Sequence, residues 1–294
     1  MKLKKKKFCR RNEVDLKEIR INLECNQGCP FCNTDENAEN VITDTEKIKK
    51  TIKTWAKQGT KFLTISGKEP TLHPELINFI KLAKKCNYET INLQTNAVLL
   101  KNKKFCEEIK RAGLDGVFVS FHSCKKNNYN KITRSLKFEE AVLGIKNLLK
   151  NNIKVRLNIV INSLNYKEIP QNIDFIAKNF KGIEAVIFSF AAPVGKAKEN
   201  NWIIPQISAA IPFLRKAVKK ALKHKLRFEI PSRCGFPMCF LPEYYNYFDD
   251  ITTIYSWDKN KFNDKVKPIW CRDCRLRQYC SGFWKDYVKI YGFK

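Results

Sequence analysis

Apolar, β-branched runs alternate with amphipathic stretches through the first two-thirds of the chain. The runs predict strands, because valine, isoleucine and aromatic residues favour extended backbone, and the stretches between them repeat apolar residues at helical spacing. Thr43–Glu46 is a capping box that predicts a helix running to about residue 57. The six expected strands are residues 17–24, 61–65, 90–94, 116–121, 155–161 and 185–190, and further helices are expected at residues 74–85, 103–112, 137–150 and 166–179.

Six consecutive strand–helix units predict a parallel sheet with right-handed crossovers. The expected fold class is therefore α/β, a partial (β/α)6 TIM-like barrel. In that architecture the ligand site gathers at the carboxyl ends of the strands. We expect Glu69, Asn96, Ser120 and Asn158 to share that end with the loop after the first strand.

The last third of the chain has a different character. A basic amphipathic helix is expected at residues 209–223, with Pro212 in its first turn, where proline is tolerated. A short strand near residues 227–230 precedes a region with five cysteines and few regular elements. The expected domains are a basic tail (1–16), the barrel (17–225) and a small cysteine-rich domain (226–294).

Three cysteines crowd the loop after the first strand. Cys25, Cys29 and Cys32 leave three and then two residues between thiols, and the three histidines of the chain lie elsewhere. A four-iron cube held by three thiolates keeps one iron open to bind and activate a small molecule. A zinc knuckle is the alternative, but zinc prefers four ligands, usually arranged as two close pairs. The spacing therefore favours an iron–sulfur cluster.

With Phe31 before its third cysteine, this CxxxCxxC loop resembles the signature of the radical S-adenosylmethionine (radical SAM) superfamily. The resemblance implies a [4Fe-4S] cluster whose open iron binds the amino and carboxylate groups of S-adenosylmethionine. It also implies reductive cleavage to a 5′-deoxyadenosyl radical, with a reductase or ferredoxin as electron donor. The protein then supplies binding, orientation and shielding. Phe31 matches a position near the adenine, and simple packing is its alternative role.

The segment Ser66-Gly67-Lys68-Glu69-Pro70 follows the second expected strand and resembles the Gly-Gly-Glu-Pro segment of that superfamily. Its implied task is to hold the methionine ammonium, for which glycine permits close backbone approach and a carboxylate accepts hydrogen bonds. We therefore expect Ser66, Gly67 and Glu69 at the cofactor. Lys68 replaces the second glycine and would be strained if that position needed a positive φ. A plain strand-to-helix turn is the alternative.

Three later positions resemble cofactor contacts of the superfamily. Asn96 lies in a Gln-Thr-Asn segment similar to Thr-Asn-Gly, with Ala97 in place of the glycine, and turn formation is its alternative role. Ser120 matches a serine that touches the ribose or carboxylate of the cofactor. Asn158 is a polar residue in an apolar strand, so it must bond either a ligand or a neighbour.

Two further features carry weaker signals. Pro193–Ala197 resembles the Pro-x-Gly-Arg-Ala loop that follows the sixth strand in the superfamily. His122 stays outside the expected catalytic set, since substrate contact, proton transfer and a hydrogen-bonded wall position are all open to it.

The five cysteines of the last domain are Cys234, Cys239, Cys271, Cys274 and Cys280. The Cys-x2-Cys-x5-Cys run resembles the auxiliary-cluster domain of the SPASM and twitch subgroup, although Trp284 stands where another cysteine is expected. Five thiols suffice for one auxiliary [4Fe-4S] cluster. We expect the last four to be its ligands and Cys234 to be a spare or alternative ligand. A structural zinc site on the same thiols is the alternative.

Amino-acid composition indicates which cellular compartment and which kinds of partner to expect. Twelve cysteines, mostly in two groups, fit metal binding in a reducing cytosol, so a cytoplasmic protein is expected. The formal net charge of +27 makes a nucleic-acid partner conceivable, but the lysines spread along the whole chain and no motif with stacking aromatics is present, so nucleic acid is not favoured. No apolar run approaches membrane-spanning length, and no membrane partner is expected.

Together these features predict a radical SAM enzyme that abstracts hydrogen from a substrate inside the barrel. The subgroup resemblance implies a peptide or protein substrate first, with RNA modification and cofactor biosynthesis on a small molecule as alternatives. The competing hypothesis is a non-catalytic zinc or iron–sulfur binding module. Such a module would close each metal site with four ligands and would not bind S-adenosylmethionine.

Overall fold

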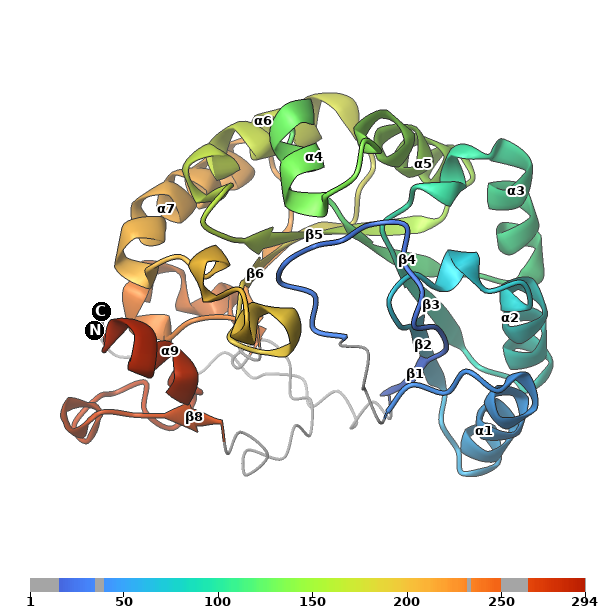
Figure 1. Cartoon of the computed structure of the whole chain (residues 1–294), viewed down its shortest axis with the longest axis horizontal. Coiled ribbons are helices and arrows are strands. Elements are labelled where there is room, and N and C mark those ends of the chain that lie inside the picture. Colours follow the sequence, from blue (N-terminus) through green and yellow to red (C-terminus); the bar gives the residue numbers. More distant parts are fainter. Residues whose placement is uncertain (1–15, 35–39, 232–233, 250–263, 294) are drawn as a thin grey trace.

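The computed structural model describes residues 16–34, 40–231, 234–249 and 264–293 of the chain. Seven parallel strands form one sheet in the order of the sequence, with β1 at one edge and β7 at the other. The sheet curves into an open arc, as Figure 1 shows. Its strands are β1 (Leu16–Arg20), β2 (Phe62–Ser66), β3 (Thr90–Thr95), β4 (Gly116–Ser120), β5 (Lys154–Ile161), β6 (Ala185–Phe190) and β7 (Phe228–Glu229).

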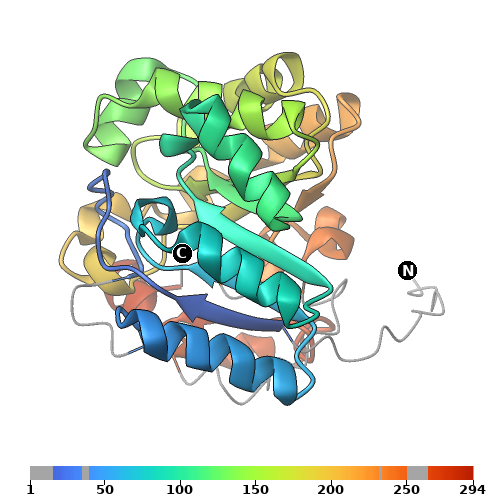
Figure 2. The ribbon, with the colours of Figure 1, turned by 90° about the vertical axis from the view of Figure 1, so that its right-hand side faces the viewer.

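Helices cover the convex face of the arc (Figure 1), and Figure 2 shows α1, α2 and α3 lying over the first strands. The helices between the strands are α1 (Thr45–Lys57), α2 (Leu76–Lys85), α3 (Lys103–Ala112), α4 (Lys126–Thr133), α5 (Phe138–Lys150), α6 (Ile169–Asn179) and α7 (Ile207–Lys223). The predicted α/β partial barrel is confirmed, and β7 adds a seventh strand to the six expected. The first strand ends at Arg20, earlier than expected.

Strand β5 shows why the inner face of the sheet is polar. Val155, Leu157 and Ile159 are fully buried, whereas Arg156 and Asn158 between them are only partly buried. Successive side chains of a strand point to opposite faces, so the apolar set meets the helices and the polar set meets the barrel interior. Asn158 was expected at the carboxyl end of its strand. It lies instead within β5 and reaches the interior from the inner face.

Helix α7 begins earlier than expected, at Ile207, so Pro212 lies in its second turn and not in its first. The helix can start there because the Tyr287 hydroxyl accepts a hydrogen bond from the Ile207 N–H at 2.8 Å. That donor would otherwise be one of the unpaired groups of a helix start. The partner lies far along the chain, which is why the local sequence did not indicate this boundary.

The C-terminal region attaches to the same end of α7. Strands β8 (Lys265–Val266) and β9 (Phe283–Trp284) pair antiparallel and lead into α9 (Lys285–Tyr291). The Tyr291 hydroxyl donates to the Ile204 carbonyl at 2.8 Å. Among the helices within the described ranges, none is both long and apolar enough to cross a bilayer.

Candidate active site

The chain between β1 and the cysteine loop is bonded to the segment after β2. The Lys68 N–H donates to the Asn22 carbonyl at 2.9 Å, and the Glu69 N–H donates to the Glu24 carbonyl at 3.0 Å. Gly67 has a φ of +136°, and a Cβ there would lie 2.7 Å from the Asn22 oxygen. Glycine is therefore required at position 67 by the close approach of two backbones. Lys68 has no positive φ, so replacing the second glycine causes no backbone strain.

Glu69 connects the ends of β2 and β3. Its carboxylate is fully buried and accepts from the Thr71 N–H and hydroxyl at 3.1 and 2.5 Å, from the Thr95 hydroxyl at 2.7 Å and from the Asn96 N–H at 2.7 Å. Burial raises the pKa of Glu69, and these hydrogen bonds oppose the rise. The arrangement makes Glu69 a residue that positions Asn96 beside the cysteine loop.

Asn96 in turn contacts the first cysteine. Its side-chain amide donates to Asn26 Oδ1 at 2.6 Å and lies 3.9 Å from Cys25 Sγ, while its own oxygen accepts from the Val98 N–H. Ala97, where the superfamily segment has glycine, adopts a φ of +62°. The turn therefore keeps the left-handed conformation without the residue that favours it.

The cysteine loop is also fixed from two distant segments. The Gly28 N–H donates to the carbonyl of Thr133, the last residue of α4, at 2.7 Å. The Lys196 N–H donates to the Cys32 carbonyl at 2.9 Å. Its neighbour Gly195, with a φ of +53°, approaches the same oxygen so closely that a Cβ would lie 2.3 Å from it. The loop expected from Pro193–Ala197 thus packs directly on the third cysteine.

All three cysteines of this loop line one cavity of about 470 Å³. Of the expected cofactor contacts, the cavity is lined by Phe31, Gly67, Asn96, Ser120 and Asn158. Glu69 and Ser66 are not among the lining residues, and the Ser66 hydroxyl donates to Glu18 at 2.5 Å. Lining residues that sequence reasoning did not assign include Lys68, His122, Ser189, Lys196 and Cys234.

The three thiols are close enough to influence one another electrostatically. Burial raises the pKa of Cys25 to about 11, with the negative charges of Glu69 and Cys32 adding to the effect. Burial and the nearby Cys32 and Cys25 thiols raise the pKa of Cys29 still further. Thiolates at this position therefore need a positively charged partner. Soft sulfur donors converging from one loop on an open cavity fit an iron–sulfur cluster with one exposed iron.

The auxiliary cysteines form a second group. Burial, followed by the neighbouring Cys280, Cys271 and Cys274 thiols, raises the pKa of Cys239 to about 11. Burial and the neighbouring Cys274 and Cys280 thiols also raise the pKa of Cys271, and the nearby charges of Lys267 and Arg277 only partly oppose the rise. A shallower hollow of about 390 Å³ beside Cys274 is lined by Lys267, Cys274, Arg275, Arg277 and Gln278. Within the described residues, no three possible ligand side chains lie close enough together to hold a single metal ion. The auxiliary cluster expected on these four thiols therefore stays a prediction.

Cys234 lies at the wall of the barrel cavity. It is one of the lining residues, and its carbonyl accepts from the N–H of Phe190, the last residue of β6, at 2.6 Å. The segment that carries Cys234 is thereby attached to the end of β6. Its expected role as a spare or alternative auxiliary ligand stays a prediction.

The fold is a partial parallel barrel, and three thiols of one loop face its interior. This combination of fold and site corresponds to the class of radical-generating iron–sulfur enzymes. The family model of the radical SAM superfamily matches residues 19–176, and the chain belongs to that superfamily. The expectations of an enzyme, a [4Fe-4S] cluster and S-adenosylmethionine are thereby confirmed.

Curated relatives share a common description. A probable GTP 3′,8-cyclase of Saccharolobus solfataricus is 31% identical over 187 residues, which is 62% of this chain and 59% of that protein. A probable GTP 3′,8-cyclase of Sulfurisphaera tokodaii is 25% identical over 276 residues, or 91% of this chain and 79% of that protein. The chain thus matches about three-fifths of the length of the first relative.

Solved structures share the fold. SuiB of Streptococcus suis aligns with a TM-score of 0.59 at 16% identity, over 74% of this chain and 49% of that chain. The structure of anSMEcpe with S-adenosylmethionine and a peptide bound aligns with a TM-score of 0.59 at 17% identity, over 73% and 63%. At such identities the likeness concerns the fold alone.

Proposed function

We propose that this radical SAM enzyme acts on a small anionic molecule in a step of cofactor biosynthesis. The observation that carries the proposal is the charge of the barrel cavity. Lys68 and Lys196 line it, and no carboxylate is present among its lining residues within the described part of the chain. A site lined in this way favours phosphate or carboxylate groups and disfavours cations.

In this proposal Cys25, Cys29 and Cys32 hold the [4Fe-4S] cluster. A cluster held there would supply the electron for reductive cleavage of S-adenosylmethionine. The amide of Asn96, directed at Cys25 Sγ, orients that cysteine from outside the ligand set. Gly67 leaves backbone atoms accessible at the cavity wall, where they can bond the methionine moiety.

Ser120 on β4 and Asn158 on β5 supply further polar groups to the cavity wall. The Asn158 oxygen already accepts from the Ser189 hydroxyl at 2.7 Å, which leaves its N–H₂ group to face the cavity. Ser120, the last residue of β4, lines the same wall. We propose that both contact the cofactor and that Phe31 packs against its adenine.

The curated relatives support a nucleotide as the first substrate to test, since those at 31% and 25% identity are described as GTP 3′,8-cyclases. The peptide substrate expected from the subgroup resemblance has weaker support. SuiB and the peptide-bound anSMEcpe are only 16% and 17% identical to the chain. We further propose that Cys239, Cys271, Cys274 and Cys280 hold an auxiliary cluster.

The test is anaerobic reconstitution with iron and sulfide, followed by dithionite, S-adenosylmethionine and GTP. We expect about eight irons per chain, the sum of two four-iron cubes, and release of 5′-deoxyadenosine that increases when GTP is added. Dithionite replaces the protein electron donor, and a Cys29→Ala variant is the matched control. Stimulation by peptides or by tRNA, with none by GTP or other small anions, would overturn the proposal.

A further inference from the structure

The ring of His122 is held in one orientation at the cavity wall. His122 follows β4, lines the cavity and is only 2% exposed. Its Nδ1 accepts a hydrogen bond from the Val160 backbone N–H at 3.2 Å, and the Phe31 ring meets it edge-on with centroids 5.0 Å apart. A backbone N–H can only donate, so Nδ1 carries no proton and the neutral ring bears its proton on Nε2.

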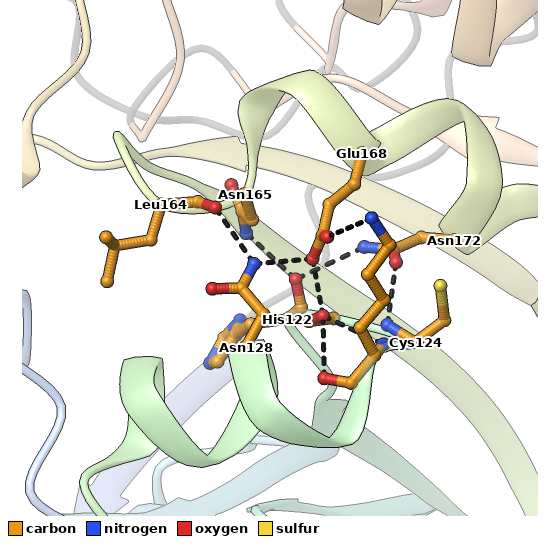
Figure 3. A network of polar contacts seen from close by, with 9 residues as sticks. His122, Cys124, Asn128, Leu164, Asn165, Glu168 and Asn172 are labelled. Carbon is orange, nitrogen blue, oxygen red and sulfur yellow. Dashed lines mark hydrogen bonds and ion pairs between the residues drawn. The ribbon is translucent and has the colours of Figure 1, made fainter.

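The backbone behind the ring is clamped by a polar network on the side away from the cavity. The His122 carbonyl accepts from the side-chain amides of Asn165 and Asn172, at 2.9 and 3.2 Å. The next residue, Ser123, donates to Glu168 at 2.5 Å, and Asn128 donates to the same carboxylate oxygen at 2.6 Å. Figure 3 shows these side chains converging from α4, from α6 and from the segment between β5 and α6.

This network has a consequence for binding. Because its members pair with one another, they fix the main chain at His122 without using the ring nitrogens. Within the described residues Nε2 has no hydrogen-bond partner, whereas Nδ1 is occupied. A preorganised donor loses little rotational freedom when a ligand arrives, so its hydrogen bond contributes more of its energy to affinity.

The ring is a donor and not a base. Burial lowers the pKa of His122 to about 4, so the imidazole is neutral at neutral pH. Its only unprotonated nitrogen already accepts the Val160 bond and is therefore unable to take a proton from a substrate. What remains is the Nε2–H of a ring that lines the cavity, whose charged lining side chains are two lysines and no described carboxylate.

We infer that His122 is a specificity-determining residue whose Nε2–H donates a hydrogen bond to an acceptor atom of the molecule bound in the barrel cavity. The acceptor belongs either to the anionic substrate, in which case the inference rests on the proposed function, or to S-adenosylmethionine. Both sources present oxygen or ring-nitrogen acceptors to the same donor, and they can be separated by measurement.

The test uses two amide variants that differ in reach. In His122→Asn the side-chain oxygen can replace Nδ1 as the acceptor for Val160, but its amide is too short to replace Nε2. In His122→Gln the longer side chain carries an N–H near the position of Nε2. For reconstituted holoenzyme we would measure the Kd of S-adenosylmethionine, 5′-deoxyadenosine formation with and without GTP, and thermal unfolding.

The expected result is a loss of about tenfold in His122→Asn, corresponding to one unmade hydrogen bond in a buried site, with most of it restored in His122→Gln. A weaker S-adenosylmethionine Kd assigns the acceptor to the cofactor. An unchanged Kd with lost GTP stimulation assigns it to the substrate. Equal behaviour of His122→Asn and wild type in both assays overturns the inference.

A failure of the proposed function can be distinguished from a failure of the inference about His122. If GTP does not stimulate wild-type enzyme, that proposal fails, and the S-adenosylmethionine Kd alone decides the role of His122. An unchanged Kd in His122→Asn then overturns the inference. Should His122→Asn not accumulate as holoprotein, His122→Ser, which also lacks the reach to Nε2, is compared with His122→Gln in the same assays.

Discussion

The carbonyl oxygen of Cys32 accepts a hydrogen bond from the N–H of Lys196 at 2.9 Å. The loop after β6 therefore holds the third cysteine of a loop that follows β1. Gly195 makes this contact possible, because any side chain there would meet the same oxygen. The Pro-x-Gly-x-Ala pattern thus has a structural explanation in this chain: close backbone approach to the cysteine loop.

Replacing Gly195 with alanine should displace Cys32. The new Cβ would lie 2.3 Å from the Cys32 oxygen, and a backbone atom cannot move aside as a flexible side chain can. We expect Gly195→Ala to lose roughly half of its reconstituted iron, one of two four-iron cubes, and nearly all 5′-deoxyadenosine formation. The control is Gly182→Ala, where φ is also positive, at +88°, but an added Cβ would meet no atom within 4 Å, so this variant should keep both iron and activity. Equal iron content in the two variants would contradict the role of Gly195.

The position of Cys234 predicts a difference between two serine variants. Cys239→Ser should lower iron from about eight to about four per chain, because it removes one of the four proposed ligands of the auxiliary cluster. Cys234→Ser should leave iron content unchanged, because Cys234 lines the barrel cavity and the four other thiols suffice for one four-iron cluster. Iron and sulfide analysis of both variants tests this difference. Loss of iron in Cys234→Ser would show that Cys234 is one of the auxiliary ligands.

The turn at Ala97 combines backbone strain with a buried methyl group. A left-handed alanine costs about 1–2 kcal/mol, and glycine would relieve this at an entropic cost of about 0.5–1 kcal/mol. The Ala97 methyl is fully buried, and its loss costs about 0.8 kcal/mol. We therefore expect Ala97→Gly to change the free energy of unfolding by less than about 1 kcal/mol, because relief of strain offsets the lost burial. A urea titration measures this, and destabilisation by about 2 kcal/mol or more would contradict the strain at Ala97.

Gly144 in α5 lies beneath the same turn. An added Cβ would lie 2.0 Å from the Ala97 carbonyl oxygen. Gly144→Ala should therefore destabilise the protein by about 2 kcal/mol or more, despite the better helix propensity of alanine. The urea titration that measures Ala97→Gly checks this, and wild-type stability in Gly144→Ala would show that α5 and the turn can separate.

Burial of neutral His122 predicts acid sensitivity. The unfolded ring titrates near 6.5 and the folded ring at about 4, so only the unfolded chain binds a proton between these values. Stability should fall as pH falls through this window, by about 2 kcal/mol at pH 5 relative to pH 7. His73, whose pKa burial also lowers, acts in the same direction.

The matched variant isolates this contribution. His122→Gln should show a shallower decline of unfolding free energy between pH 7 and pH 5, since the contribution of His73 is unchanged. Parallel pH profiles for wild type and His122→Gln would mean that His122 is not buried in its neutral form.

Much of the fold could be predicted from the sequence because its strands are buried against helices. Apolar runs rich in β-branched and aromatic residues located all six expected strands, and strand ends with polar residues indicated the cavity wall, as for Ser120. The later placements depended on contacts between distant residues. The start of α7 depends on Tyr287, and the short strand expected near residues 227–230 joins the barrel sheet, as β7, through its pairing with β6.

Residues of the site could likewise be predicted from the sequence where the signal was local. The cysteine loop and Gly67 could be identified from local motifs, because their chemistry fixes residue types at short spacing. The surroundings of Glu69 could not, since its carboxylate is surrounded by groups from the ends of two strands. The signal for Ser189 was present in the sequence, as a polar residue in the otherwise apolar β6.

The anchoring of the cysteine loop also sets an order of events during biosynthesis. Gly28 and Cys32 are bonded to Thr133 and Lys196, which leave the ribosome long after the thiols themselves. In a nascent chain the loop with the three cysteines therefore lacks these backbone contacts until the sixth strand and the loop after it have been synthesised. Iron delivery belongs after that moment, and during the interval the thiols depend on the reducing power of their surroundings for protection.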